Sequence, residues 1–212
     1  MMKIGIIGAT GRVGSAILNE AEARGHKVTA LVRNADKAKE MFGTDAAIIE
    51  KDALALDATD LNQFDVVVDA FASPEAYQHL DLATKLISLF RNNKQIRLMF
   101  IVGSSSLKKA DGTRMLDDVL KMFANEPWVA TPIQQVHELE FLQWVDNVDW
   151  SAISPQVNFE PGKKTQYHVG TDEVMENKAG KQAVSFGNFA GALVDELEAP
   201  QHKQQRFTVV DD

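Results

Sequence analysis

The sequence predicts a doubly wound α/β fold, in which helices cover both faces of a parallel sheet. Short apolar runs rich in Val and Ile alternate with amphipathic helical patterns through the first half of the chain. This alternation supplies the helical crossovers that parallel strands require. The chain has 212 residues, of which 45% are hydrophobic, and this size suits a single compact domain spanning 1–212.

Each element follows from its hydrophobic period and its stop signals. Two of the helical patterns close on a glycine, Gly25 and Gly43, as helices commonly do. We predict strands at 3–7, 27–32, 46–50, 65–71, 97–103, 149–154 and 205–210, and helices at 12–25, 35–43, 74–93, 115–123, 133–145 and 186–198. The turn-rich segment at about 155–185 predicts a small, irregular C-terminal substrate lobe over the sheet.

Composition excludes several classes of function. The net charge of −8 argues against a nucleic-acid partner. The absence of cysteine excludes disulfides and thiolate sites, and no histidine or acidic cluster has the spacing of a metal site. No apolar run reaches the length of a membrane span or forms a secretory signal, so we expect a cytoplasmic protein. The sequence leaves the oligomeric state open.

The stretch IGIIGATGRVGSAI, from Ile4 to Ile17, places three glycines between the first strand and the first helix. A helix N-terminus offers unpaired N–H groups and a partial positive charge, and glycine lets a phosphate approach its backbone closely. The spacing is G-x-x-G-x-x-G, and its strand–turn–helix context predicts a dinucleotide site. Its predicted contacts are Gly8, Thr10, Gly11, Arg12, Val13 and Gly14.

The end of the second strand indicates which dinucleotide is bound. The segment VTALVRN contains no acidic residue to hold a ribose 2′-hydroxyl, and it ends in Arg33 and Asn34. A guanidinium can pair with a 2′-phosphate through two hydrogen bonds, and Arg12 could reach the same phosphate. We therefore expect NADP(H) to be preferred, with NAD(H) possible. The alternative is that Arg33 is a solvated loop residue.

Ligands of such folds lie beyond the carboxyl ends of the strands, which supplies further candidates. Asp52 could accept a hydrogen bond from the adenine amino group, or it could be an ordinary turn aspartate. Ser104 and Ser105 could position the nicotinamide or the acceptor, or they could serve their loop. The remaining predicted contacts are Ala53, Phe71, Ala72, Ser73, Gly103, Ser154 and Pro155.

The sequence resembles the short-chain dehydrogenase/reductase superfamily, in its atypical NmrA-like branch. The ordered segments that carry the resemblance are IGIIGATGRVGSAI, DVVVDAF, VDWSAISPQVNFEPG, FGNFAGALVDELE and QRFTV. Within that branch the chain is similar to bacterial NAD(P)H-flavin reductases. The resemblance implies a single Rossmann domain that binds NAD(P)H and reduces a flavin, which is a substrate and not a tightly bound group. The GSSSL segment at 103–107 departs from the glycine-containing loop common in that family.

The proton donor typical of the superfamily, Tyr-x-x-x-Lys, is absent. Tyr77 is followed four residues later by Asp81, and Tyr167 by Thr171. Hydride transfer to a ketone builds an alkoxide and needs a donor, whereas a flavin or quinone spreads the charge over a conjugated ring that solvent can protonate. The expected function is NAD(P)H-dependent reduction of a free flavin or a quinone-like acceptor by hydride transfer. The alternative is a non-catalytic NADP(H) sensor that binds a partner protein.

Overall fold

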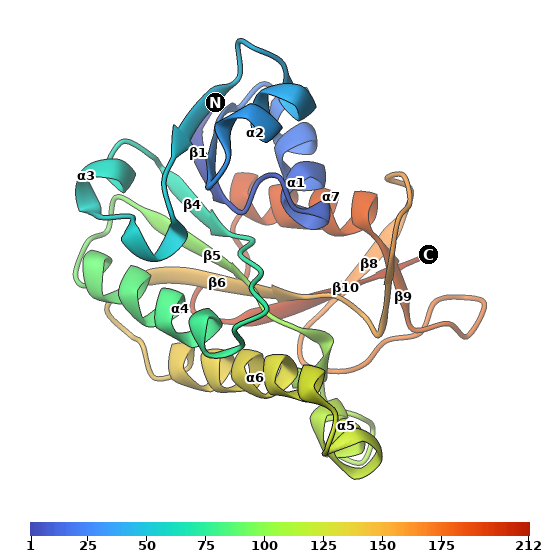
Figure 1. The fold of residues 1–212 in the computed structure, drawn as a ribbon. Helices are drawn as coiled ribbons and strands as arrows, with labels where there is room; N and C mark the ends of the chain where they lie inside the picture. Colours follow the sequence, from blue (N-terminus) through green and yellow to red (C-terminus); the bar gives the residue numbers. More distant parts are fainter.

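The computed structural model describes residues 1–212 and contains a central eight-stranded sheet with helices on both faces (Figure 1). The sheet order is β3-β2-β1-β4-β5-β6-β10-β8. The strands are β1 (Lys3–Ile7), β2 (Lys27–Val32), β3 (Ala47–Glu50), β4 (Val66–Asp69), β5 (Arg97–Ile101), β6 (Asp149–Ser154), β7 (Asn158–Glu160), β8 (Tyr167–Gly170), β9 (Ala183–Ser185) and β10 (Arg206–Asp211). The helices are α1 (Arg12–Ala23), α2 (Ala35–Phe42), α3 (Ala58–Leu61), α4 (Tyr77–Phe90), α5 (Met115–Phe123), α6 (Ala130–Leu142) and α7 (Phe186–Glu198), with 3₁₀ turns η1 (Ala53–Ala55), η2 (Ser104–Ser106) and η3 (Pro127–Val129).

The topology confirms the predicted doubly wound fold. From β1 the chain moves outward to β2 and β3, returns to β4 on the other side of β1, and continues toward the opposite edge. All neighbouring pairs of the sheet are parallel except β10 with β8. The strand order therefore reverses between β1 and β4, and the carboxyl ends of these two strands form the switch point where a ligand is expected.

The core has one layer on each side of the sheet. One layer contains 23 buried residues and lies under α1 and α7, and the other contains 22 and lies under α4 and α6. Within β4, Val66 and Val68 face the first layer and Val67 faces the second, because successive side chains of a strand alternate. Burial on both faces explains why the central strands are continuous apolar runs in the sequence.

Several strands and helices have ends that differ from the predicted ones by one to three residues. Strand β4 ends at Asp69, because its carboxylate Oδ1 accepts the Phe71 N–H at 3.0 Å and turns the chain. Strand β5 likewise ends two residues before the predicted limit. Helix α4 begins at Tyr77, and the preceding turn is held by Ser73, whose Oγ accepts the Glu75 N–H at 3.1 Å.

Helix α6 begins three residues before the predicted start, and Pro132 lies in its first turn, where no N–H partner is needed. Helix α3 was not predicted, because its four residues are too few to show a helical period. The segment 155–185 was predicted to be irregular, but β8 extends the main sheet and β7 pairs with β9. None of the helices combines the length and apolar character that crossing a bilayer requires.

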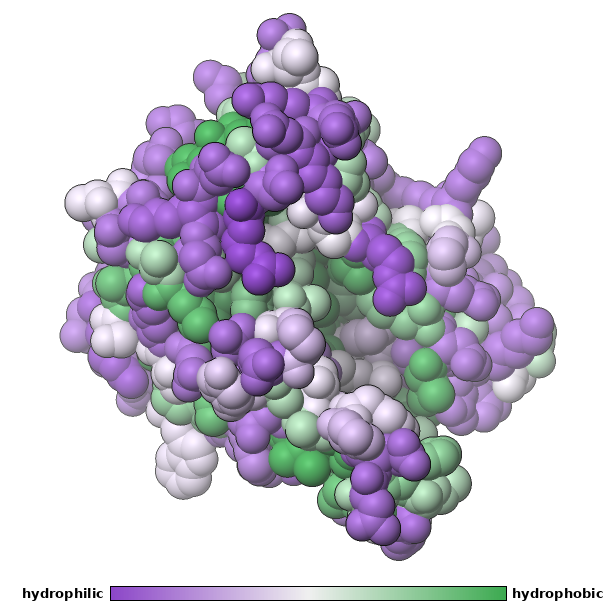
Figure 2. All heavy atoms as spheres, in the orientation of Figure 1, coloured by the Kyte–Doolittle hydropathy of each residue, from purple (hydrophilic) through white to green (hydrophobic).

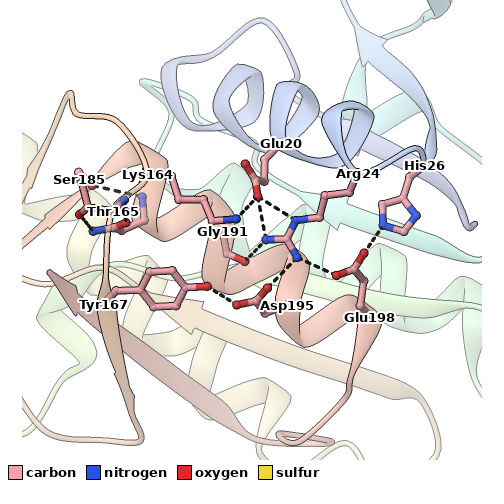
Figure 3. A network of polar contacts seen from close by, with 11 residues as sticks. Glu20, Arg24, His26, Lys164, Thr165, Tyr167, Ser185, Gly191, Asp195 and Glu198 are labelled. Atoms are coloured by element: carbon pink, nitrogen blue, oxygen red, sulfur yellow. Dashed lines mark hydrogen bonds and ion pairs between the residues drawn. The ribbon is translucent and has the colours of Figure 1, made fainter. Parts of the chain in front are cut away.

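A polar network joins α1, α7 and β8 on the outer side of the first layer (Figure 3). Arg24 pairs with Glu20, Asp195 and Glu198 at 2.6–2.7 Å, and the Tyr167 hydroxyl donates a hydrogen bond to Asp195. These contacts join segments that are more than 140 residues apart in the sequence. They place the Tyr167 hydroxyl against α7 and not at the carboxyl ends of β1 and β4.

Candidate functional site

A cavity of about 280 Å³ opens at the switch point, beyond the carboxyl ends of β1, β2 and β4. Figure 2 shows this face of the molecule hollowed at its centre. Half of the lining residues are hydrophobic, as is usual for a small-molecule site. The lining residues are Ile7, Gly8, Thr10, Gly11, Leu31, Val32, Arg33, Asn34, Lys37, Lys51, Ala53, Ala70, Phe71 and Ala72.

The glycine turn forms a cradle that side chains would fill. Gly8 has φ of +75°, and a Cβ atom there would lie 2.5 Å from the carbonyl oxygen of Ala70. A Cβ atom at Gly14 would lie 2.4 Å from the carbonyl oxygen of Gly8, so the helix can pack on the strand only through glycine. Gly11 differs, because its φ is ordinary and its Cβ position meets only the Gly8 oxygen, at 3.1 Å.

The N-terminus of α1 is free to bind an anion. No side chain caps this 12-residue helix, and its first turn contains no acidic residue. Its unpaired N–H groups and the positive end of its dipole therefore remain for a ligand phosphate. Gly8, Thr10 and Gly11 line the cavity, whereas Arg12 and Val13 lie beside it on the first turn of the helix. The residues present therefore fit the pyrophosphate of a dinucleotide.

Three cationic side chains line the cavity. Arg33 and Lys37 line it and are exposed, and their side chains form no hydrogen bond or ion pair with the protein. The Lys51 ammonium also lines it, but two carboxylates of the adjacent turn hold it at 3.0 and 2.6 Å. Asn34 caps α2, because its Oδ1 accepts the Lys37 N–H at 2.8 Å. Arg33 and Lys37 are thus the unpaired cations available to a phosphate in this cavity.

Two predicted contacts have structural roles of their own. The carboxylate of Asp52 accepts the Leu54 N–H at 2.8 Å and does not line the cavity, which agrees with the interpretation of an ordinary turn aspartate. Its neighbour Ala53 does line the cavity. The Ser73 hydroxyl donates to Gln78 at 2.6 Å and lies outside the lining.

The ends of β5 and β6 differ in accessibility. Ser104 and Ser105 are partly exposed and their hydroxyls form no hydrogen bond within the protein, so they can contact a ligand. Gly103 lies against α6, where a Cβ atom would be 2.2 Å from Gln135 Oε1. Ser154 and Pro155 do not fit the predicted binding role, because both are buried and Arg206 donates to the Ser154 hydroxyl at 3.1 Å.

Sequence reasoning missed a group of buried polar side chains behind the cavity. Asp69, His79 and Glu138 are all less than 10% exposed. Burial raises the pKa of Asp69 to about 7, although the Phe71 N–H opposes this shift. Burial raises the pKa of Glu138 well above its usual range, and the negative charge of Asp69 adds to the shift. Burial also lowers the pKa of His79, so that its ring stays neutral.

A signal for two of these residues was present in the sequence. Asp69 ends the otherwise apolar run VVVD, and Glu138 occupies the apolar face of its helix, one turn before Leu142. A carboxyl at a position reserved for apolar side chains is a candidate for a perturbed group. The burial itself depends on how α6 packs on the sheet, which the pattern does not show.

Comparison with known proteins decides the family. The model of a family described as NAD(P)H-binding matches residues 8–200. The chain belongs to this NAD(P)H-binding family. It is 43% identical to the uncharacterized protein YwnB of Bacillus subtilis (strain 168), over 99% of this chain and 98% of that protein.

Two solved structures of similar proteins agree with this assignment. A Lactobacillus casei protein is 40% identical with a TM-score of 0.94, and 99% of each chain is covered. A Streptococcus pneumoniae TIGR4 protein with the provisional name NADH-flavin reductase is 32% identical with a TM-score of 0.88, over the full length of both chains. The family and its Rossmann-like oxidoreductase fold confirm the resemblance to atypical short-chain dehydrogenases/reductases.

Replacing Gly11 with aspartate should abolish dinucleotide binding without unfolding the protein. The new carboxylate would project into the cavity and repel the pyrophosphate, and we expect a loss of at least about 100-fold in affinity. Titration with NADPH, followed by its fluorescence, measures this loss. Gly11→Ala is the matched control and should retain most of the affinity. Equal NADPH affinity of Gly11→Asp and the parent protein would show that the phosphates bind elsewhere.

Replacing Asp69 with asparagine should change how stability depends on pH. The folded-state pKa of about 7 lies above the reference value of 3.8, so between these values only the folded protein holds the proton. The free energy of unfolding of the parent protein therefore falls as the pH rises from 4 to 7. The Asp69→Asn variant has no titrating group at this position. Between pH 4 and pH 8 its free energy of unfolding should therefore rise, relative to that of the parent, by up to about 4 kcal/mol. Urea denaturation at both pH values measures the difference, and parallel pH profiles would contradict the assignment.

Proposed function

We propose that the protein is an NADPH-dependent oxidoreductase that reduces a free flavin or a quinone-like acceptor by hydride transfer. The observation that carries the proposal is a glycine cradle at the switch point, open to a cavity with two unpaired cations. Membership of the NAD(P)H-binding family supports a nicotinamide cofactor. The provisional name of the streptococcal relative supports a flavin as the acceptor.

Different residues of the cavity would bind different parts of the dinucleotide. The N–H groups at the start of α1 would hold the pyrophosphate, and Arg33 with Lys37 would pair with a 2′-phosphate. When bound, the cofactor supplies a hydride. The loops at 70–72 and 103–106 would then orient the reacting groups and exclude water, which is most of what such a transfer requires of the protein.

Neither tyrosine has the lysine partner of the superfamily's usual general acid. Tyr77 is 55% exposed at the first residue of α4. Tyr167 is held by Asp195, and burial together with that carboxylate raises the pKa of its hydroxyl. Carbonyl reduction by the usual donor of the superfamily is thus unsupported, which favours an acceptor that spreads charge over a conjugated ring.

An acceptor panel tests the proposal directly. NADPH oxidation is followed at steady state with FMN, FAD, riboflavin and several small quinones, and we expect turnover with at least one of them. NADPH binding without turnover on any acceptor would contradict the proposal and favour the sensor.

Arg33 should set the cofactor preference. We expect NADPH to bind more tightly than NADH, and Arg33→Ala to reduce this preference by roughly 10-fold to 100-fold, because a charge-assisted pair contributes about 1.5–3 kcal/mol. Lys37→Ala should reduce it less, since a single ammonium makes no bidentate contact. Lys39→Ala, on the same helix but outside the cavity, is the control. A full preference in both cavity variants would mean that another cation, such as Arg12, binds the phosphate.

Turnover should depend less on the hydroxyls of Tyr77 and Tyr167 than on those of Ser104 and Ser105 in η2. Tyr77→Phe/Tyr167→Phe should cost far less than the roughly 100-fold to 10,000-fold expected for loss of a general acid. Ser104→Ala/Ser105→Ala should slow turnover more than it weakens NADPH binding, because these hydroxyls would position the reacting groups. Steady-state rates on the best acceptor compare the two double variants. A large loss of rate in a folded tyrosine variant would refute the proposal that solvent, and not a tyrosine, protonates the acceptor.

A further inference from the structure

Three buried titratable groups lie between the sheet and the helices α4 and α6. Asp69 is the last residue of β4, His79 lies in the first turn of α4, and Glu138 lies on α6. The Asp69 side chain points to the same side of the sheet as Val67, which belongs to the core layer under these helices. The proposed hydride transfer uses none of the three groups.

These groups lie directly behind two loops that border the ligand end of the sheet. Asp69 Oδ1 accepts the Phe71 N–H at 3.0 Å, and Phe71 lines the cavity. Glu138 follows Gln135 by one helical turn, and Gln135 Oε1 packs against the backbone of Gly103. In Figure 1 the segment after β4 runs across this face to the start of α4. A charge that develops on a ligand between these loops would therefore act on the carboxyl groups behind them.

No cation faces the carboxyls. On α4 the facing titratable group is the neutral His79, whose ring edge packs on Phe71 at a centroid distance of 5.7 Å, while Lys85 reaches the carbonyl of Leu54 instead. The η2 turn contributes only serines. The nearby arginines are engaged elsewhere, in the ion pairs Arg114–Glu140 and Arg206–Asp172.

Glu138 accepts no hydrogen bond, and Asp69 accepts only one, from a backbone N–H. Burial with so few donors and no counter-ion favours the protonated form of both carboxyls. Of the two, Asp69 adjoins the cavity, because it accepts the N–H of Phe71, which lines it.

We propose that Asp69 is a charge-compensating group: it holds its proton more tightly while reduced dinucleotide is bound than when the nicotinamide ring is cationic. The proposal rests on the proposed function only for the place of the nicotinamide. Ionisation breaks the carboxyl O–H bond, leaves a negative charge behind the cationic ring and passes the proton to solvent. The acceptor gains the hydride and takes one proton from solvent, and Asp69 takes up a proton again when the oxidised dinucleotide leaves. Glu138 stays neutral throughout, so only one charge is buried.

The size of the effect can be estimated. At an effective dielectric constant of about 20, a positive charge on the order of 10 Å from a carboxyl lowers its pKa by roughly one unit. From a starting pKa of about 7, NADP⁺ binding at pH 7 should release about 0.4 proton per site, whereas NADPH binding should release almost none. By linkage, the affinity for NADP⁺ relative to NADPH should rise about 5-fold from pH 6 to pH 8. Titration of the 2′-phosphate cancels in this ratio because both ligands carry it.

Calorimetric titration with NADP⁺ and NADPH, in buffers that differ in ionisation enthalpy, measures the released protons. Release with NADP⁺ should disappear in Asp69→Asn, whose amide oxygen can still accept the Phe71 N–H. It should persist in Glu138→Gln, which mimics the neutral acid, and in the control Asp81→Asn on the exposed side of α4. Retained NADPH binding shows that each variant is folded.

Equal proton release with both ligands, or release that persists in Asp69→Asn, would overturn the proposal. Loss of release in Glu138→Gln with retention in Asp69→Asn would also overturn it, because the titrating group would then be Glu138. If Asp69→Asn fails to fold, the pH dependence of the NADP⁺ to NADPH affinity ratio in the parent protein decides, and a flat ratio from pH 6 to pH 8 refutes the proposal. The measurements need no acceptor, so a failed acceptor panel and a failed proton linkage are separate results.

Discussion

The structure depends on the close approach of three backbone segments at Gly8. The β1 strand meets the turn after β4 through the carbonyl oxygen of Ala70, and α1 packs on the carbonyl oxygen of Gly8 through Gly14. A single methyl group at either glycine would force these segments apart, because the Cβ atom would lie within 2.5 Å of an oxygen. This packing brings the N-terminus of α1 to the ends of β1 and β4. The cavity, its free N–H groups and the loop at 70–72 all follow from it.

The two sides of the sheet hold their polar groups differently. On the side of α1 and α7, Arg24 and its carboxylate partners form paired charges at the margin of the core, which join distant segments. On the side of α4 and α6, Asp69 and Glu138 are buried without a counter-ion. Paired charges can serve structure alone, whereas unpaired buried carboxyls destabilise the fold at neutral pH and need another reason to be present.

The sequence was sufficient to predict all strands of the main sheet except β8, and much of the cavity. The glycine turn was recognised from its spacing between a strand and a helix, and Arg33, Phe71 and Ala72 from their place after strands. Lys37 was missed because a lysine on an amphipathic helix looks like any solvated residue. Ligands of such folds bind beyond the carboxyl ends of the strands, which identifies the correct edge of the sheet. This does not show whether a side chain at that edge already forms hydrogen bonds within the protein. Ser154 lies at that edge and is held by Arg206, 52 residues later in the chain.

The burial of the two carboxyl groups could be recognised only from the structure. In the sequence, Asp69 interrupts an apolar strand and Glu138 an apolar helix face, and either could have turned toward solvent. Their burial is decided by the packing of α6 on the sheet and by the hydrogen bond that turns the chain at Phe71. Such long-range packing is not encoded in any one segment, so local periodicity could not predict it.

The central claim is that a nicotinamide dinucleotide binds across the switch point of this sheet, and backbone hydrogen exchange with and without NADP⁺ tests it most directly. The account predicts slower exchange at 8–15, 31–37 and 70–73, with a smaller effect at 103–107. It predicts no change in β8 and α7, where Tyr167 and Asp195 lie. Protection confined to β8 and α7, or protection that misses the glycine turn, would contradict it.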